Sequence, residues 1–184
     1  MSNRLFNFIG GDTGSWQVIS QEAVAGAPLE RVARLEVVQG RLDALPDGSE
    51  WNLRGVTSHE RYVTRSEQEL LIARQPALGR PAATRAALIP ITKSADWWKL
   101  PQDERRRIFE TQSHHIETGL KYLPAVARRL HHGYDLGEPF DFLTWFEFAP
   151  ADADAFEELV GSLRRSEEWS YVEREIDIRL AGVE

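Results

Sequence analysis

Two histidine pairs and one arginine pair lie within the stretch SHHIETGLKYLPAVARRLHH, at positions 113 to 132. Imidazoles can ligate metals and move protons, and a guanidinium carries a permanent positive charge. Adjacent residues point in different directions on a helix or a strand, so one member of a pair can be buried while its neighbour is solvated. The elements that hold these residues therefore decide which of them could do chemistry.

The first histidine pair falls on a predicted helix that begins near Pro101 and runs to about Leu120, with acidic residues in its first turn. His115 lies seven residues after Ile108 and returns to nearly the same face. His114 instead falls among charged residues, so the pattern predicts a buried His115 and a solvated His114. A buried His115 could be a core histidine with one hydrogen bond or a ligand. Zinc is disfavoured, because no HExxH spacing is present.

The second histidine pair and the arginine pair fall on a predicted strand at 125–132, AVARRLHH. One side of this strand holds Val126, Arg128, Leu130 and His132. The other side holds Ala127, Arg129 and His131. If Val126 and Leu130 mark the inward side, Arg128 points into the core and Arg129 faces out. A buried guanidinium stays charged, so Arg128 either forms an internal ion pair, with Glu147 or Glu168, or has a functional role.

Further elements surround this strand. Strands are predicted at 53–63, 86–92, 140–148 and 171–180, and helices at 66–75 and 152–165. Phe156, Leu159, Val160 and Leu163 share one face of the last helix. Over roughly residues 84–180 the order is β-α-β-β-α-β, a ferredoxin-like α+β arrangement. The stretch at 32–40, VARLEVVQG, is compatible with a strand or a helix.

Composition limits the classes of function. With 184 residues, 42% of them hydrophobic, the chain can bury one core but is short for two domains, so we expect one domain over residues 1–184. A formal net charge of −7 without a long basic run argues against nucleic acid and membrane surfaces as partners. The absence of cysteine excludes disulfides and thiolate sites. The first residues show no signal-peptide pattern, and we expect a cytoplasmic protein.

The segment KSADWWKLPQDERRRIFETQSHHIETGLKYLPAVARRLHHGYDLGEPFDFLTWFEF, at 93–148, resembles the haem-binding core of the chlorite dismutase family, in particular its short-chain dimeric lineage. The similarity runs from RYVTR at 61–65 to EREIDIRL at 173–180, about two thirds of the chain. The resemblance implies a ferredoxin-like dimeric α+β barrel. It also implies haem b with its iron as the cofactor, chlorite as a small anionic substrate, and a homodimer.

Carried over residue by residue, the resemblance makes His115 the proximal ligand of the haem iron. Glu168 matches the carboxylate that accepts a hydrogen bond from the other imidazole nitrogen, which would strengthen the ligand. Glu167 is the alternative if the register differs by one. Lys93 matches a residue that can meet a haem propionate, and Trp97 can pack on the proximal side.

Three more residues follow from the same resemblance. Ile91 belongs to the pocket wall, and Tyr62 is a weaker candidate for a propionate contact. Gln75 aligns with the distal glutamine of the dimeric lineage. Ordinary core packing stays open as the alternative for Trp97 and also for its neighbour Trp98.

The resemblance implies an enzyme, a haem-dependent oxidoreductase that decomposes chlorite to chloride and dioxygen. Arg128 would supply a permanent positive charge that orients chlorite and restrains hypochlorite, and Gln75 would hold the arginine in position. Two alternatives remain. One is a coproporphyrin-haem decarboxylase, a class that generally lacks the distal arginine. The other is a non-enzymatic haem-binding or haem-sensing protein, for which His115 would suffice.

Overall fold

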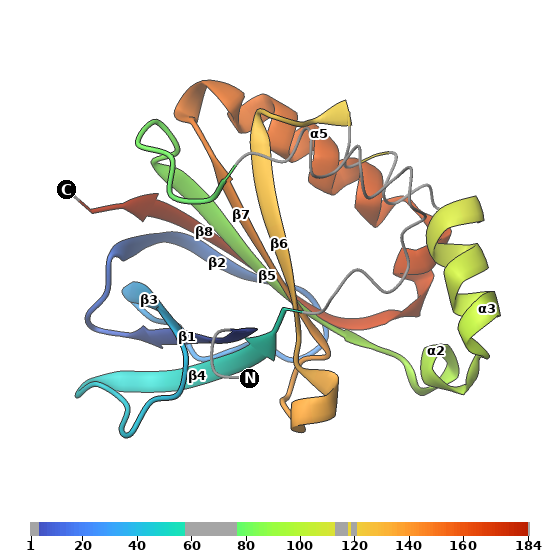
Figure 1. Cartoon of the computed structure of the whole chain (residues 1–184), viewed down its shortest axis with the longest axis horizontal. Coiled ribbons are helices and arrows are strands. Elements are labelled where there is room, and N and C mark those ends of the chain that lie inside the picture. The colour runs from blue at the N-terminus through green and yellow to red at the C-terminus, as the bar shows by residue number, and fades with distance from the viewer. Residues whose placement is uncertain (1–3, 58–76, 113–117, 119–120, 184) are drawn as a thin grey trace.

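An antiparallel β-barrel forms the centre of the molecule. The computed structural model describes residues 4–57, 77–112, 118 and 121–183. Within them, eight strands close in the order β1-β3-β2-β8-β5-β7-β6-β4 (Figure 1). The strands are β1 (Leu5–Gly11), β2 (Trp16–Ala25), β3 (Arg34–Gln39), β4 (Ser49–Val56), β5 (Arg85–Lys93), β6 (Val126–His132), β7 (Phe142–Phe148) and β8 (Val172–Gly182).

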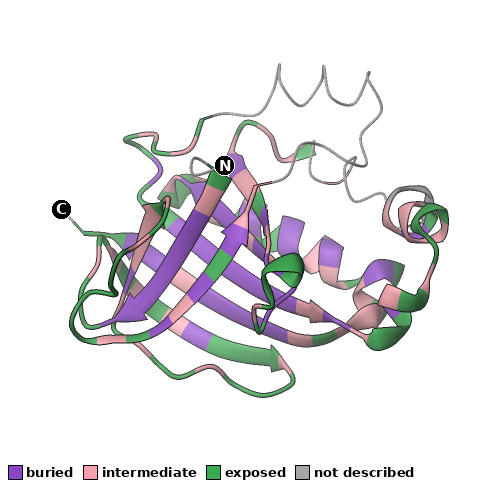
Figure 2. Ribbon diagram, turned by 60° about the horizontal axis from the view of Figure 1, so that its bottom comes forward, coloured by how far each residue is buried: buried purple, intermediate pink, exposed green. Residues whose placement is uncertain are grey.

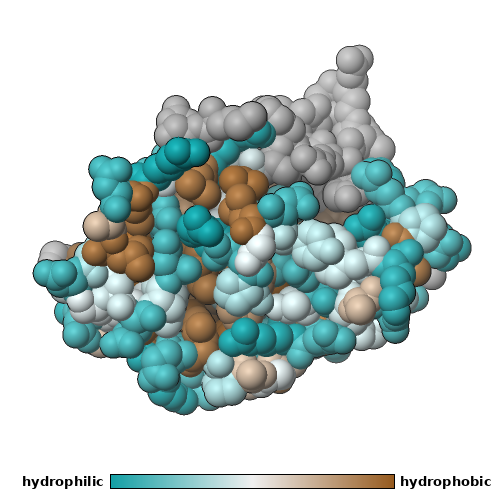
Figure 3. Space-filling view, turned by 90° about the horizontal axis from the view of Figure 1, so that it is seen from below, coloured by the Kyte–Doolittle hydropathy of each residue, from teal (hydrophilic) through white to brown (hydrophobic). Residues whose placement is uncertain are grey.

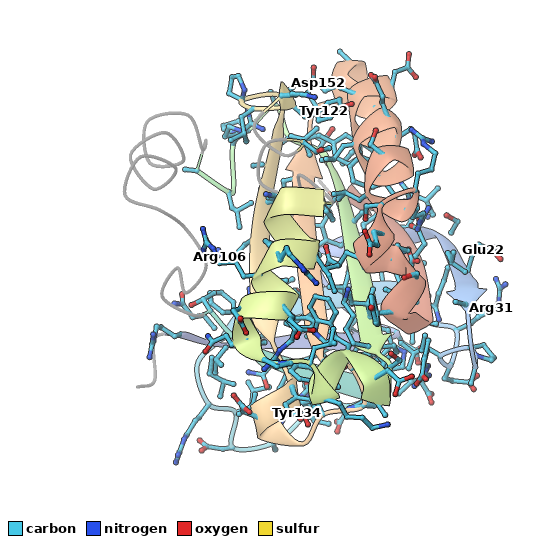
Figure 4. The ribbon with its side chains drawn as sticks, turned by 90° about the vertical axis from the view of Figure 1, so that its right-hand side faces the viewer. Glu22, Arg31, Arg106, Tyr122, Tyr134 and Asp152 are labelled. Atoms are coloured by element: carbon cyan, nitrogen blue, oxygen red, sulfur yellow. The ribbon has the colours of Figure 1, made fainter. Side chains whose placement is uncertain are left out.

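Most of the helices lie over one outer face of this barrel, and the short helix after β6 lies at one end of it (Figure 1). They are α2 (Ala95–Lys99), α3 (Gln102–Arg106), the π-helix η2 (Arg107–Gln112), the 3-10 helices η3 (Tyr134–Leu136), η4 (Pro150–Asp152) and η5 (Glu167–Tyr171), and α5 (Ala153–Arg164). In the view onto this face, α3 and α5 flank the strands, with Tyr122 and Asp152 at one end and Tyr134 at the other (Figure 4). No described helix is long and apolar enough to cross a membrane.

The C-terminal half follows the predicted order of elements, and the protein is a mixed α/β structure. Strands β8, β5, β7 and β6 are neighbours in that order, and all of their pairings are antiparallel. One predicted boundary is wrong, because β4 ends at Val56. The helix after Pro101 becomes π-helical at Arg107, and the described residues next to its predicted end near Leu120, Thr118 and Lys121, are helical. The ambiguous stretch at 32–40 is a strand, β3. The helix predicted at 66–75 lies outside the described residues.

Two separate hydrophobic cores pack against opposite faces of the same strands. The first lies inside the barrel and includes Phe8, Leu88 and Leu143. The second lies between the sheet and α5, whose buried residues Phe156, Leu159, Val160 and Leu163 are those that the sequence predicted. Strand β5 is buried on both faces, which explains its nearly continuous apolar run (Figure 2). By contrast, the surface seen from the side of β4 and η3 is largely hydrophilic, with smaller apolar patches (Figure 3).

The prediction that Arg129 faces outward from β6 is wrong. Both Arg129 and His131 lie on the barrel side of the strand, where they line a cavity. Leu130, expected to mark the inward side, is 41% exposed. The side chains of β6 alternate as predicted, but both faces of the strand are covered over part of its length, so there is no single inward side.

His131 is the most deeply buried histidine of the described chain, at 1% exposure. Its ring meets the rings of Phe6 and Phe8 edge-on, each at a centroid distance of 4.9 Å. Its Nδ1 lies 3.2 Å from the carbonyl oxygen of Leu143, which can only accept, so the neutral ring carries its proton there. Burial lowers the pKa of His131 to about 4, and the positive charge of Arg129 acts in the same direction.

This pKa predicts that the protein loses stability in mild acid. Unfolded His131 titrates near pH 6.5 and folded His131 near 4, so the unfolded chain binds more protons between these values. The contribution of His131 to the free energy of unfolding is therefore fully present above about pH 6.5 and is lost as the pH falls toward 4. Between pH 7 and pH 5 the free energy of unfolding should drop by about 2 kcal/mol from this group.

Urea unfolding of the wild type and of His131→Phe at both pH values measures this contribution. The phenylalanine variant should lack this part of the pH dependence, whatever its absolute stability. The same pH dependence in both proteins would show that His131 is not responsible. The other histidines are identical in the two proteins and cancel in the comparison.

Candidate functional site

Arg128 lies on the helix-covered face of β6, opposite to Arg129. In the antiparallel register Arg128 is paired with Phe146, whereas Arg129 is paired with Trp145, so the alternation of each strand separates the two arginines. The half-buried Arg128 joins a pocket whose other lining residues are Ile89, Ile91, Thr144, Phe146, Val160, Leu163 and Trp169. One cation therefore sits in a wall that is otherwise almost entirely apolar.

Glu147, one of the two carboxylates considered for an ion pair with Arg128, lies on the other face of the sheet. It accepts hydrogen bonds from the Trp145 indole at 2.8 Å and from the Gly79 backbone N–H at 2.5 Å. Together with Arg129 it lines the cavity inside the barrel. The alternation of β7 therefore excludes Glu147 as the partner of Arg128.

Lys93 and Glu168 form a buried ion pair beside this wall. The Lys93 ammonium lies 2.7 Å from Glu168 Oε1, and the two side chains are 1% and 6% exposed. The ammonium also lies 4.5 Å from the centre of the Trp97 ring. Burial lowers the pKa of Lys93, and the charge of Glu168 opposes that shift. The structure pairs Lys93 with Glu168, and the predicted contact of Lys93 with a haem propionate stays a prediction.

The end of β5 holds Lys93 in this orientation. The Lys93 backbone N–H donates to Asp141 Oδ2 at 2.7 Å, and the Trp98 indole donates to the same oxygen at 3.1 Å. The following residue, Ser94, caps α2 by accepting from the Trp97 backbone N–H. Burial raises the pKa of Asp141, while these hydrogen bonds counteract the shift. The last residue of β5 is therefore hydrogen-bonded to the Asp141 carboxylate, and the chain continues directly into α2, which carries Trp97 and Trp98.

The two neighbouring tryptophans have different surroundings. Trp97 is buried, and its ring lies 5.4 Å from that of Tyr171 and next to the Lys93 ammonium. Trp98 is stacked on Tyr134 at a centroid distance of 3.8 Å. Trp97 therefore belongs to the surroundings of the ion pair, and Trp98 packs against the η3 turn.

Sequence reasoning missed Trp169, which follows Glu168 on η5 and lines the Arg128 pocket. Its indole donates to Glu175 Oε2 at 2.8 Å, and Arg164 Nε donates to Glu175 Oε1 at 2.8 Å. Glu175 is 1% exposed, and its hydrogen bond with the indole holds the Trp169 side chain in place. The available signal was an aromatic residue directly after the carboxylates in SEEWSY.

In that segment Glu168 is buried and Glu167 is exposed, so the two candidates for the carboxylate behind the proposed iron ligand differ in their surroundings.

The structure brings Ile91, Arg128, Lys93, Trp97 and Glu168 to the helix-covered side of the sheet. The remaining candidates lie outside the described residues: His114, His115, Gln75 and Tyr62. Their assignments stay predictions.

A family model for chlorite dismutase matches residues 46–183 of the chain. The crystal structure of a dimeric chlorite dismutase from Nitrobacter winogradskyi is similar with a TM-score of 0.89 and 56% sequence identity. That similarity covers 97% of this chain and 99% of the other.

Two more distant relatives are similar to this chain over different parts of their length. A chlorite dismutase from Ideonella dechloratans is 34% identical over 122 residues, which are 65% of this chain and 41% of that protein, so the chain spans less than half of that relative's length. A mutant chlorite dismutase from Candidatus Nitrospira defluvii has a TM-score of 0.71 at 20% identity, over 100% of this chain and 92% of the other. The latter likeness concerns the fold alone.

Proposed function

The chain belongs to the chlorite dismutase family, and from this premise we propose that it binds haem b and decomposes chlorite to chloride and dioxygen. The observation that supports this most directly is Arg128, a permanent cation on an apolar wall next to the buried Lys93–Glu168 pair. A small anion is attracted to such a charge, and the apolar surroundings strengthen the attraction.

The chemical character of the described pocket residues supports a haem. A porphyrin is flat and largely apolar, and the pocket offers aliphatic and aromatic surface from β5, β7, α5 and η5. In the proposal, His115 ligates the iron and Glu168 accepts a hydrogen bond from that imidazole. Haem would supply the redox centre at which the chlorine–oxygen bonds are broken.

In this proposal Lys93 acts indirectly on His115, the iron ligand. Its ammonium holds Glu168 Oε1, and the Trp97 ring covers the ammonium, so the carboxylate has little freedom to turn. A fixed carboxylate behind a ligating imidazole sets the orientation of its ring and raises its basicity. Lys93 and Trp97 are therefore positioning residues in this proposal.

Arg128 would bind chlorite and restrain hypochlorite by charge alone. A guanidinium does not deprotonate near neutral pH, so this role involves no proton transfer. Gln75 would hold the arginine in place, and Ile91 and Trp169 would exclude water from its surroundings. Tyr62 is a further candidate for contact with a propionate.

The same proposal extends to the assembly. We infer one domain over residues 1–184, a ferredoxin-like arrangement within the barrel, and a homodimer. The dimeric relative from Nitrobacter winogradskyi and the strand order β8-β5-β7-β6 support these inferences.

An oxygen electrode tests the activity. Chlorite added to the haem-loaded protein should release dioxygen and chloride in equal amounts, because one chlorite ion contains both. A protein that binds haem and releases no dioxygen would be a non-enzymatic haem-binding protein, and the proposed activity would be wrong.

The ligand assignment is tested by a matched pair of variants. His115→Ala should lose most of its haem during gel filtration and should change the absorption spectrum of what remains, because the iron loses its protein ligand. His114→Ala should retain haem and spectrum. Equal losses in both variants would contradict the predicted helix face.

A further inference from the structure

Two carboxylates of β8 are buried on the helix-covered side of the sheet. Residues 175–178 are all buried, and Ile176 and Ile178 belong to the core inside the barrel. Because side chains alternate along a strand, Glu175 and Asp177 point to the opposite face. Glu175 is paired with Ile91 of β5, which lines the pocket of the proposed haem site, and cross-strand partners share a face. The two acids therefore lie on the side of the sheet that holds this site.

Arg164 of α5 binds both of these carboxylates. Its Nε donates to Glu175 Oε1 at 2.8 Å, and its Nη2 donates to Asp177 Oδ2 at 2.7 Å. Asp177 also accepts from Arg179, which reaches the exposed Glu157 at 2.7 Å. Burying two carboxylates and a guanidinium costs free energy that apolar side chains of the same volume would not cost, so stability alone does not explain this network.

Trp169 joins the network through Glu175. Its indole N–H donates to Glu175 Oε2 at 2.8 Å, so the two oxygens of Glu175 have separate donors, the indole and Arg164. The Trp169 ring lines the Arg128 pocket, and its centre lies 5.7 Å from the Lys93 ammonium. The orientation of this one ring therefore shapes both the pocket wall and the surroundings of the ammonium.

We propose that Glu175, held by Arg164, is a positioning residue that fixes the Trp169 ring in the wall of the haem site. The inference rests on the proposed function, because it concerns the shape of that site. Trp169 lies on η5, a five-residue 3-10 helix, whose backbone alone leaves several side-chain rotamers open. The hydrogen bond to a buried carboxylate selects one of them.

The indole signals in a nitrogen-edited NMR spectrum of the full chain without haem test the orientation of the ring. Trp169→Phe identifies the Trp169 signal by its loss. In Glu175→Gln the side chain keeps its shape but has one oxygen for two donors. The Trp169 signal should therefore shift, and its N–H should exchange with solvent about threefold to tenfold faster. An unchanged Trp169 signal in this variant would overturn the inference.

Transfer of haem from the loaded protein to an excess of apomyoglobin measures the consequence for the pocket. Glu175→Gln should lose haem about threefold to tenfold faster than the wild type, because the ring no longer has a fixed place in the wall. Asp177→Asn is the matched control, since it weakens the same buried network and keeps the bond between Glu175 and Trp169. This variant should lose haem at nearly the wild-type rate. Equal acceleration in both variants would make the network purely structural and overturn the inference.

The double variant Trp169→Phe with Glu175→Gln shows whether Glu175 acts through Trp169. Phenylalanine has no N–H group, so Glu175→Gln should add no further acceleration of haem loss in this background. An added effect as large as that in the wild type would overturn the inference. A wild-type chain that retains no haem would overturn the proposed function and this inference together, whereas the NMR comparison without haem tests the inference alone.

Discussion

Replacing Arg128 by alanine should lower the rate of dioxygen release from chlorite about 10²-fold and should release hypochlorite into solution. Among the described residues of the pocket wall, Arg128 is the only charged one, and the others are apolar or weakly polar. The apolar surroundings strengthen the attraction of this charge for a small anion, and no other described residue of that wall can replace it. Without the Arg128 charge, chlorite should be less well oriented and hypochlorite less well retained.

An oxygen electrode and a chlorination trap measure the two consequences separately. Arg128→Lys should fall between the wild type and Arg128→Ala, because the ammonium keeps the charge and loses the planar fork. The chain has no cysteine and only the initial methionine, so escaping oxidant should modify haem, tryptophan and tyrosine. A wild-type oxygen yield and haem lifetime in Arg128→Ala would make Arg128 a structural residue.

Replacing Lys93 by methionine should lower the free energy of unfolding by about 3–5 kcal/mol. The substitution removes the ammonium from a pair whose side chains are 1% and 6% exposed, and it leaves the Glu168 carboxylate buried without that countercharge. Methionine has a similar length, so lost packing contributes little. The loss should come from breaking this buried charge pair.

Urea unfolding with two companion variants tests this explanation. Lys99→Met removes an ammonium from an ion pair with Asp96, in which the side chains are 74% and 79% exposed, and should change stability by less than about 0.5 kcal/mol. The double variant Lys93→Met with Glu168→Gln should recover part of the loss, because the buried charge is gone. Equal losses in Lys93→Met and Lys99→Met would show that burial of the pair is unimportant.

The sequence by itself determined the local elements and the alternation along them. The order of strands and helices over 84–180, the apolar face of α5 and the separation of Arg128 from Arg129 all follow from periods of 3.6 and 2 residues. These are properties of neighbouring residues, so no knowledge of distant contacts is needed. The family resemblance likewise depended on local motifs.

Only the tertiary structure decided what covers each face and which charges meet. Barrel closure buries His131 and partly covers Arg129 on a face that the sequence assigned to solvent, because the strands that cover it come from the N-terminal half. Lys93 and Glu168 are 75 residues apart, and no periodicity relates them. Long-range pairing depends on how sheet and helices close around a core, and a residue pattern along one strand contains no information about the element that packs against it.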